Sequence, residues 1–245
     1  MTKTALITGA TGAIGAALCT RFANDGFAVL ALDKVRPTVP SPCRFVDADL
    51  DRFATDAAYR DTVLHEIRGA LPPTGLDVLI NNAAVQRLGS TATLAPESWH
   101  ETLNVNVTAP FLLVQGMLRE LEAARGCVVN ITSVHAHLTK PEFAAYATSK
   151  AALEGLTRAL AVDLGPAVRV NGIAPAAIDT QMLRAGFADP QALAALKRFH
   201  PVGDIGTPEQ VASVAAAIVA ADLRFLSGSI VRLDGGIGAR LHDPV

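Results

Sequence analysis

Cysteine, net charge and long apolar runs are all scarce in this chain of 245 residues. Its three cysteines, Cys19, Cys43 and Cys127, lack the paired spacing of a zinc site or a redox motif, so we expect reduced thiols and no metal site. The formal net charge is −2, with acidic and basic residues interspersed. Such a balance produces no field that would concentrate nucleic acid or an anionic membrane. A small molecule is therefore the expected partner.

No apolar stretch reaches the ~20 residues of a membrane span. The first apolar run is interrupted by Gly9 and Gly12 before it is long enough for a signal peptide, which predicts a cytoplasmic location. Half of the residues are hydrophobic, enough for one large core, and no repeat or linker divides the chain. We therefore expect a single domain over residues 1–245.

Short apolar segments that are typical of buried parallel strands alternate with amphipathic helical segments, which is the pattern of a doubly wound sheet. The expected strands are Thr4–Thr8, Ala28–Asp33, Arg44–Val46, Val78–Asn81, Cys127–Ser133, Arg169–Ala174 and Ser229–Leu233. The expected helices are Ala13–Asn24, Arg52–Arg68, Pro96–Glu101, Val107–Ala123, Ala145–Leu164, Asp189–Phe199 and Pro208–Ala220. The predicted fold class is α/β, with a mostly parallel, seven-stranded sheet covered by helices on both faces.

The first expected strand leads through a glycine-rich turn, Thr8–Gly15, directly into a helix. A turn without side chains lets the backbone approach a pyrophosphate, whose charge then faces the N–H groups and dipole of the helix N-terminus. The glycines alone are equally compatible with a tight turn that binds no ligand.

Asp33 ends the second expected strand, near the ~20 residues beyond the turn at which an acidic residue contacts the adenosine ribose. Its carboxylate can accept hydrogen bonds from ribose hydroxyls and repel a 2′-phosphate, which favours NAD(H) over NADP(H). A solvated or capping aspartate is the alternative. Lys34 weakens the preference, because its amine can pair with a phosphate.

Polar residues also end two other strands, at the sheet edge where nucleotides bind: Asp47-Ala48-Asp49-Leu50 and Asn81-Asn82-Ala83-Ala84. The asparagine amides can instead satisfy backbone groups where the strand ends, and both roles are compatible.

Tyr146 and Lys150 lie four residues apart and therefore on one face of an expected helix. A free tyrosine has a pKa of ~10, and a nearby ammonium stabilises its phenolate. Ser133 ends the strand before this helix, so its hydroxyl can reach a substrate oxygen in the same crevice. A tyrosine and a lysine at this spacing are by themselves common on solvated helices. Their combination with the glycine turn strengthens the prediction that they are catalytic.

Taken in order, these motifs resemble the short-chain dehydrogenase/reductase family over essentially the whole chain. The matching positions are the Thr8–Gly15 turn, Asp49, Asn81–Ala83, Asn106 within Val-Asn-Val, Ser133, Tyr146 with Lys150, Pro175 with Thr180, and Asp234-Gly235-Gly236. The resemblance implies a Rossmann fold and hydride transfer between a nicotinamide cofactor and a secondary alcohol or ketone. Three positions depart from the family pattern by one methyl group each: Ala13, Ala84 and Ala176.

The resemblance also implies a role for each site residue. Tyr146 is the general acid/base, Ser133 polarises the substrate oxygen, Lys150 holds the nicotinamide ribose and lowers the pKa of the tyrosine, and Asn106 keeps a water in the proton path. The cofactor-binding residues implied are Gly9, Thr11, Gly12, Ala13, Ile14, Gly15, Asp33, Asp49, Leu50, Asn82, Ala83, Ala84, Tyr146, Lys150, Pro175, Ile178 and Thr180.

The substrate pocket is expected to form from three segments that follow strand ends, Val85–Gly89, Val134–Phe143 and Gln181–Pro201, with the region around 180–201 as a mobile lid. The polar side chains there that can bind a polar or carboxylated substrate are Gln86, Arg87, His135, His137, Lys140 and Arg184. The alternative is that they only meet water.

Gln86 and His135, with Ser133 and Tyr146, are the candidate substrate contacts. The first two resemble groups around the carboxylate in 3-hydroxybutyrate dehydrogenases, but Phe143 replaces that family's lysine. A general secondary alcohol or ketone, including a hydroxy acid or polyol, is therefore the favoured substrate.

The family resemblance implies a homotetramer joined through the helices Val107–Ala123 and Ala145–Leu164 and the last strand; a monomer is the alternative. A non-catalytic NAD(P)-sensing regulator on the same fold is the main alternative function, and the intact Ser133, Tyr146 and Lys150 argue against it. A structural subunit and an epimerase or dehydratase are further alternatives.

Overall fold

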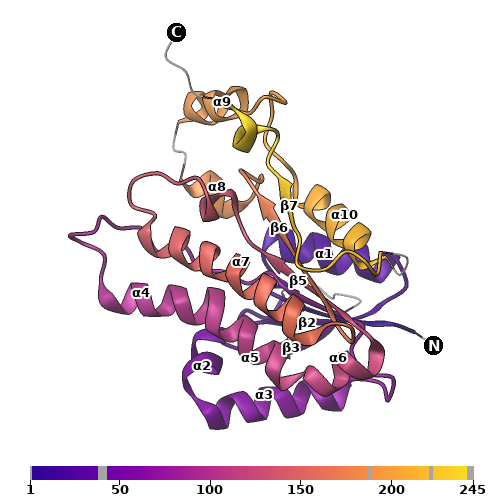
Figure 1. Cartoon of the computed structure of the whole chain (residues 1–245). Helices are drawn as coiled ribbons and strands as arrows, with labels where there is room; N and C mark the ends of the chain where they lie inside the picture. The colour runs from indigo at the N-terminus through magenta and orange to yellow at the C-terminus, as the bar shows by residue number, and fades with distance from the viewer. Residues whose placement is uncertain (1, 38–42, 187–188, 221–222, 242–245) are drawn as a thin grey trace.

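Seven strands form one parallel sheet, in the order β3-β2-β1-β4-β5-β6-β7, in a computed structural model of the chain (Figure 1). The structure describes residues 2–37, 43–186, 189–220 and 223–241. The strands are β1 (Thr4–Thr8), β2 (Ala28–Asp33), β3 (Arg44–Asp47), β4 (Val78–Asn81), β5 (Cys127–Ile131), β6 (Arg169–Pro175) and β7 (Ile230–Leu233). The predicted α/β class is confirmed, and every pairing between these strands is parallel.

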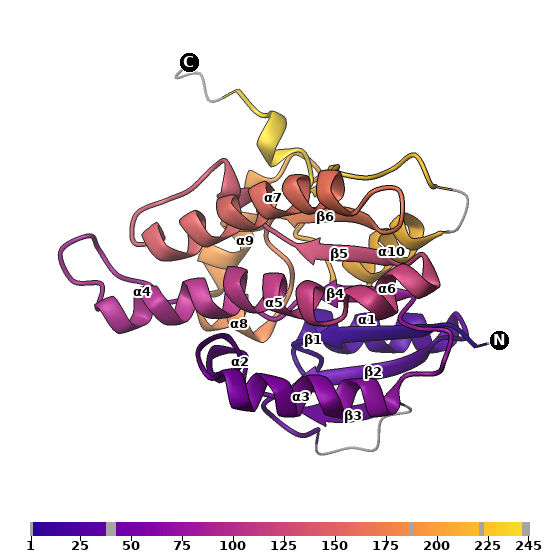
Figure 2. The ribbon, with the colours of Figure 1, turned by 60° about the horizontal axis from the view of Figure 1, so that its bottom comes forward.

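Helices cover both faces of the sheet (Figure 2). They are α1 (Ala13–Asn24), α2 (Leu50–Thr55), α3 (Ala57–Ala70), α4 (Pro96–Leu103), α5 (Ala109–Gly116), α6 (Leu118–Ala124), α7 (Ala144–Leu164), α8 (Gln181–Ala185), α9 (Pro190–Phe199) and α10 (Pro208–Val219). Helices α1 and α10 pack together on one face, and α3, α5 and α7 lie on the other. Because both faces are covered, β1, β4 and β5 are buried along their whole length, as their continuous apolar sequences require.

Two core clusters result from the alternation of side chains along the strands. Leu6 of β1 and Leu79 of β4 belong to the cluster under α3 and α5. Their neighbours Ile7 and Ile80 belong to the cluster under α1 and α10. Within the described residues, no helix combines the length and hydropathy needed to cross a membrane.

Two expected helices are interrupted, which corrects the sequence-based boundaries. The segment predicted as Arg52–Arg68 is α2 and α3, separated by Asp56, whose extended backbone and carboxylate cap the N-terminus of α3. The segment predicted as Val107–Ala123 begins as a π-helical turn over Asn104–Thr108, continues as α5 and breaks at Met117 before α6. Caps and wide turns depend on tertiary contacts that hydrophobic periodicity does not contain.

The strand order changes direction at the neighbours β1 and β4, with β2 and β3 on one side and β5 to β7 on the other. In an open parallel sheet, the crevice beyond the carboxyl ends of the strands at this switch point is the usual ligand site. The glycine turn, the asparagine pair and Ser133 all follow strands that end at this edge.

Candidate active site

A cavity of about 1020 Å³ opens at this edge of the sheet. It is at the large end of the ~300–1,000 Å³ typical of ligand sites. Every residue predicted to bind the cofactor lines it, and so do the candidate substrate contacts Gln86, Ser133, His135 and Tyr146. Among the four predicted catalytic residues, Asn106 is buried behind the wall instead. The topology therefore brings together residues as far apart in the sequence as Gly9 and Thr180.

Packing explains two of the glycines in the turn, and the cavity explains the third. A Cβ at Gly9 would lie 2.7 Å from the Cα of Ala83, and one at Gly15 would overlap the carbonyl oxygen of Gly9. A Cβ at Gly12 would meet only that same oxygen, at 3.5 Å. Gly12 precedes α1, which has no side-chain cap and no acidic residue in its first turn. The bare, positive end of this helix thus faces the cavity and fits a pyrophosphate.

Asp33 holds the glycine turn from the end of β2. Its Oδ2 accepts hydrogen bonds from the backbone N and the Oγ1 of Thr11, at 3.0 and 2.8 Å, and its Oδ1 accepts one from the backbone N of Val35. A carboxylate oxygen has room for more than one donor. Asp33 thus has the capping role that the sequence analysis weighed, and it also lines the cavity, where a ribose contact remains open to it.

Asn82 satisfies backbone groups at the strand end, the structural role predicted for the asparagine pair, whereas the Nδ2 of Asn81 donates to the side-chain Oδ1 of Asn130 at 2.8 Å. The Nδ2 of Asn82 donates to the carbonyl oxygens of Thr8 and Gly9, at 2.9 and 3.1 Å. The hydroxyl of Thr8 accepts the backbone N–H groups of Asn82 and Ala83. These bonds tie β4 to the turn after β1, and they leave Asn82, Ala83 and Ala84 on the cavity wall.

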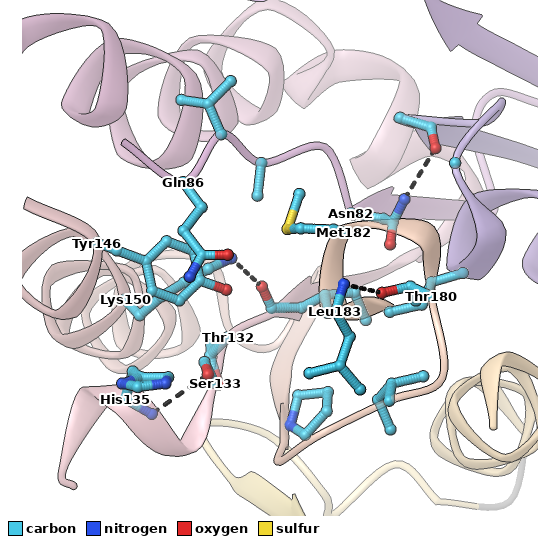
Figure 3. A pocket seen from close by; sticks show the side chains of 18 of the residues that line it. Asn82, Gln86, Thr132, Ser133, His135, Tyr146, Lys150, Thr180, Met182 and Leu183 are labelled. Carbon is cyan, nitrogen blue, oxygen red and sulfur yellow. Dashed lines mark hydrogen bonds between the residues drawn. The ribbon is translucent and has the colours of Figure 1, made fainter. Parts of the chain in front are cut away.

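Ser133, Tyr146 and Lys150 lie side by side, with Met182 and Leu183 on the opposite side of the cavity (Figure 3). Ser133 lies two residues after Ile131, where β5 ends, whereas the predicted strand extended to Ser133 itself. Its extended backbone starts a short 3₁₀ turn. Its hydroxyl accepts the backbone N of His135 at 3.2 Å. The Nζ of Lys150 donates to the carbonyl oxygen of Ile131 at 2.7 Å and lies 5.6 Å from the centroid of the Tyr146 ring.

Burial decides the protonation of this pair. It raises the pKa of Tyr146 to about 12, although the Ser133 hydroxyl acts in the opposite direction, and it lowers the pKa of Lys150 to about 8. The resemblance implied that Lys150 lowers the pKa of the tyrosine; in this structure desolvation of the phenol is the larger effect. Near neutral pH the phenol therefore keeps its proton, and it is poised as an acid.

Asn106 supports the wall from the π-helical turn. Its side chain is buried, with Nδ2 donating to the carbonyl oxygen of Val85 and to the Oγ of Ser149, both at 3.0 Å, and Oδ1 accepting the backbone N of Val85. Both amide hydrogens are thus used within the protein. This amide fixes the segment that carries Gln86 against α7, the helix of Tyr146 and Lys150.

His135 belongs to an aromatic cluster around the tyrosine. Its ring stacks on Phe143, with centroids 4.5 Å apart, and meets the ring of Tyr146 edge-on at 5.7 Å. Burial, and to a smaller extent the charge of Lys140, lower the pKa of His135 to about 4. The imidazole is consequently neutral near pH 7, where it can donate or accept a hydrogen bond but carries no charge.

Three other polar residues proposed from the sequence are engaged elsewhere. Arg87 pairs with Glu101 at 2.6 Å and Arg184 with Asp179 at 2.7 Å, and neither arginine lines the cavity. His137 lies 2.7 Å from the buried carboxylate of Glu154, also outside the cavity wall. Lys140, by contrast, does line it.

The wall also contains residues that the sequence analysis did not select. They come from the segment around 180–201, of which residues 187–188 lie outside the described part, and from the stretch after β7: Met182, Leu183, Leu196, Phe199, His200, Ile237 and Arg240. No local pattern marks them, since their placement depends on how these two segments fold back over the edge of the sheet. In the described part of the chain, no group of three or more His, Cys, Asp or Glu side chains is arranged to hold a metal ion.

Comparison with known proteins extends over nearly the whole chain. A family model described as enoyl-(acyl carrier protein) reductase matches residues 9–238. The chain is 31% identical to 3beta-hydroxysteroid dehydrogenase 1 of Eggerthella lenta, over 96% of this chain and 93% of that protein. It is 32% identical to human dehydrogenase/reductase SDR family member 4, over 98% of this chain and 88% of that protein.

Solved structures show the same architecture. The ligand-free aldohexose dehydrogenase of Thermoplasma acidophilum superposes with a TM-score of 0.92 at 27% identity, covering 100% of this chain and 97% of the other. A 4-hydroxyisoleucine dehydrogenase complexed with NADH gives 0.88 at 28% identity, covering 98% and 100%. A gluconate 5-dehydrogenase from Burkholderia cenocepacia, in complex with NADP and tartrate, gives 0.88 at 26% identity, covering 98% and 96%.

Proposed function

Because this chain belongs to the short-chain dehydrogenase/reductase family of oxidoreductases, we propose that it transfers hydride between NAD(H) and a secondary alcohol or ketone. The observation that carries the proposal is the arrangement of Ser133, Tyr146 and Lys150 on one wall of the cavity whose other end holds the glycine turn.

The two ends of the cavity fit the two parts of a dinucleotide. The uncapped N-terminus of α1, with Gly12 beside it, suits the pyrophosphate, and Asp33 suits an adenosine ribose without a 2′-phosphate. Asp49 and Leu50 would contact the adenine, Asn82 and Ala83 the adjacent ribose, and Pro175, Ile178 and Thr180 the nicotinamide side. When bound, the nicotinamide supplies the hydride acceptor or donor. Structural relatives include complexes with NADH and with NADP, so the preference for NAD(H) rests on Asp33.

The chain's own groups position the substrate and move the proton. The hydroxyl of Ser133 donates a hydrogen bond to the substrate oxygen and orients it toward Tyr146. In ketone reduction, the Tyr146 hydroxyl gives its proton to that oxygen; in alcohol oxidation, the phenolate takes it back. The ammonium of Lys150 stabilises the phenolate that forms. The apolar wall opposite, with Met182 and Leu183, keeps water away from these groups.

The decisive variant is Tyr146→Phe, which removes one hydroxyl and keeps the ring in its cluster with His135 and Phe143. Turnover of secondary alcohols and ketones, followed by the absorbance of reduced nicotinamide, should fall by about 10²- to 10⁴-fold. Affinity for NADH, measured by fluorescence titration, should remain within about twofold.

Wild-type turnover in the variant would contradict the proposed acid/base. If the wild-type protein binds NAD tightly but turns over no alcohol or ketone in a broad panel, the non-catalytic sensor replaces the dehydrogenase. The homotetramer belongs to the same proposal and rests on the family resemblance. A closing movement of the segment around 180–201 and the cytoplasmic location stay predictions from the sequence.

A further inference from the structure

The charges on the cavity wall are unevenly distributed along its length. The acidic residues that line it lie at one end, where Asp33 is the last residue of β2 and Asp49 follows β3. Beyond Tyr146, toward α9 and the stretch after β7, the charged residues on the wall are Lys140 and Arg240, both cations. Among the described residues that line this far end, none is a carboxylate.

Arg240 is held in place but not neutralised. Its Nη1 donates to the carbonyl oxygen of Phe199 at 2.9 Å, and its guanidinium lies 5.3 Å from the centroid of the Phe199 ring. The other N–H groups of the planar fork make no hydrogen bond within the described residues, and no acidic side chain there pairs with it. A guanidinium that is fixed by one nitrogen and open at the others can bind an anion with two parallel hydrogen bonds.

Lys140 is similarly placed on the opposite loop. Its Nζ lies 4.7 Å from the centroid of the Phe143 ring and, within the part of the chain described, has no acidic partner. Neighbouring cations outside the cavity differ: Arg184 and Lys197, on the two helices of the segment over the site, pair with Asp179 and Asp204. Among the described residues, Arg198 of α9 also makes no ion pair, but it lines a second cavity beside this one. Lys140 and Arg240 are thus the unpaired cations at this end of the wall itself.

Between these cations and the catalytic groups, the wall is mainly apolar. Its apolar residues are Leu138, Phe143, Met182, Leu183, Leu196, Phe199 and Ile237, and they outnumber the polar Thr139, Gln181 and His200. An apolar stretch that ends in a cation fits a molecule with a hydrocarbon body and an anionic end. Burying the hydrocarbon against the apolar wall is favourable, and the anion can pair with a cation that has no acidic partner in the protein.

We propose that Arg240, assisted by Lys140, forms an anion subsite, and that the substrate is an apolar hydroxy acid or oxo acid whose anionic group binds there while its alcohol or ketone carbon lies at Tyr146. The inference rests on the proposed function, which it narrows to a substrate class. A carboxylate and a phosphate monoester share the chemistry that this fork recognises.

The test compares substrates that differ only at the anionic end. Linear hydroxy acids of increasing chain length are assayed with NAD beside their methyl esters and beside the matching hydroxyalkyl phosphates. The wild-type protein should prefer the anionic member of each pair, mainly through a lower KM. In Arg240→Gln, the ratio of kcat/KM for acid over ester should fall by about 10- to 100-fold, the range of a lost charge-assisted hydrogen bond. Arg240→Lys should recover part of it.

Two matched variants separate the subsite from bulk charge. Arg119→Gln removes an equal charge from α6, at a position that lines neither this cavity nor the second cavity that Arg198 and Arg240 share, and should leave the ratio unchanged. Lys140→Gln should lower the ratio by less than Arg240→Gln does, because an exposed amine on a flexible stem holds an anion weakly.

Arg240 also satisfies a carbonyl at the C-terminal end of α9, so a purely structural role has its own signature. Equal losses for acid and ester in Arg240→Gln, or a wild-type preference for the ester, would overturn the subsite while the dehydrogenase stands. A binding measurement is independent of turnover: with NADH present, a saturated alkanoate should raise the melting temperature of the wild type and not of Arg240→Gln. No shift in the wild type would overturn the subsite, and a preference for the phosphates over the carboxylates would support it with phosphate as the anion.

Discussion

Tyr146 and Lys150 show how strongly a single residue's surroundings can alter the chemistry that its identity suggests. Burial disfavours charge on both groups, raising the pKa of Tyr146 to about 12 and lowering the pKa of Lys150 to about 8. Near pH 7 the phenol is therefore neutral, while the lysine still carries most of its positive charge. The tyrosine is thus ready to donate a proton in reduction, and oxidation requires a nearby positive charge to stabilise its phenolate. The spacing of Tyr146 and Lys150 was sufficient to predict that they act together, but the sign of the resulting pKa shift was not readable from it.

Cofactor preference is also decided at the scale of one residue. We expect Asp33→Asn to raise the ratio of kcat/KM for NADP over NAD by about tenfold or more, ~1.4 kcal/mol, because it removes the charge that repels a 2′-phosphate. Asparagine keeps an oxygen that can accept the Thr11 N–H, so the turn should persist. Lys34, which lines the cavity next to it, would then meet the phosphate.

The control is Asp47→Asn, which changes the net charge equally at the end of β3, outside the cavity wall. It should leave the ratio unchanged. If Asp33→Asn and Asp47→Asn behave alike, with no gain for NADP, the carboxylate of Asp33 serves the turn alone and the preference for NAD(H) loses its basis.

At the scale of elements, the sequence predicted best where local rules and burial agree. The bounds of β1, α1, β2 and β4 match the prediction residue for residue, because buried apolar runs flanked by glycine or polar residues have few alternatives. The breaks between helices at Asp56 and Met117 were not predicted. An aspartate within a helical pattern indicates a solvent-exposed helical residue, and only the structure shows that Asp56 caps α3. The short helix α8 was likewise missed within the segment expected to be a lid.

The glycine turn allows a prediction that separates fold from function within one element. Gly15→Ala should lower the free energy of unfolding by about 3 kcal/mol, since its Cβ would overlap the Gly9 carbonyl where α1 packs on β1. Gly12 has an extended backbone, and a Cβ there would have room, so Gly12→Ala should change the free energy of unfolding by less than about 1 kcal/mol. Its methyl group instead protrudes where the pyrophosphate is proposed to sit, so affinity for NADH should fall at least tenfold.

Urea unfolding and fluorescence titration of NADH give the two readouts for both variants. Equal destabilisation by the two alanines, or unchanged NADH affinity in Gly12→Ala, would show that Gly12 is a packing glycine like its neighbours and would remove the pyrophosphate from the end of α1.

At the scale of the molecule, topology explains why short motifs predicted the catalytic half of the site and not the rest. A residue that follows a strand in a parallel sheet must arrive at the carboxyl edge, so Gly9, Asp33, Asn82 and Ser133 could be placed together from the sequence. Arg240 follows no such rule. Its position on the cavity wall is fixed by its contacts with Phe199 at the end of α9. That position depends on how the whole C-terminal part of the chain folds, which no local motif predicts.

The proposed homotetramer is a prediction about surfaces that the sheet leaves uncovered. On α7, Val162 is 80% exposed, and on α5, Phe111 is 40% exposed, although both helices pack their other faces on the sheet. If these helices join subunits, Val162→Glu places an unpaired charge at the interface. In a two-fold symmetric interface each of the two subunits contributes one such charge. Light scattering after size exclusion should then give a mass near four chains for the wild type and a smaller mass for the variant.

Val35→Glu is the matched control, since Val35 is 58% exposed but follows β2 and belongs to neither of these helices. It should retain the wild-type mass. A variant at Val162 that keeps four chains would move the interface to another surface. If the wild type is itself a monomer, Val162 and Phe111 are ordinary exposed hydrophobic residues. The active site would then need no partner subunit, because the residues that line it all come from one chain.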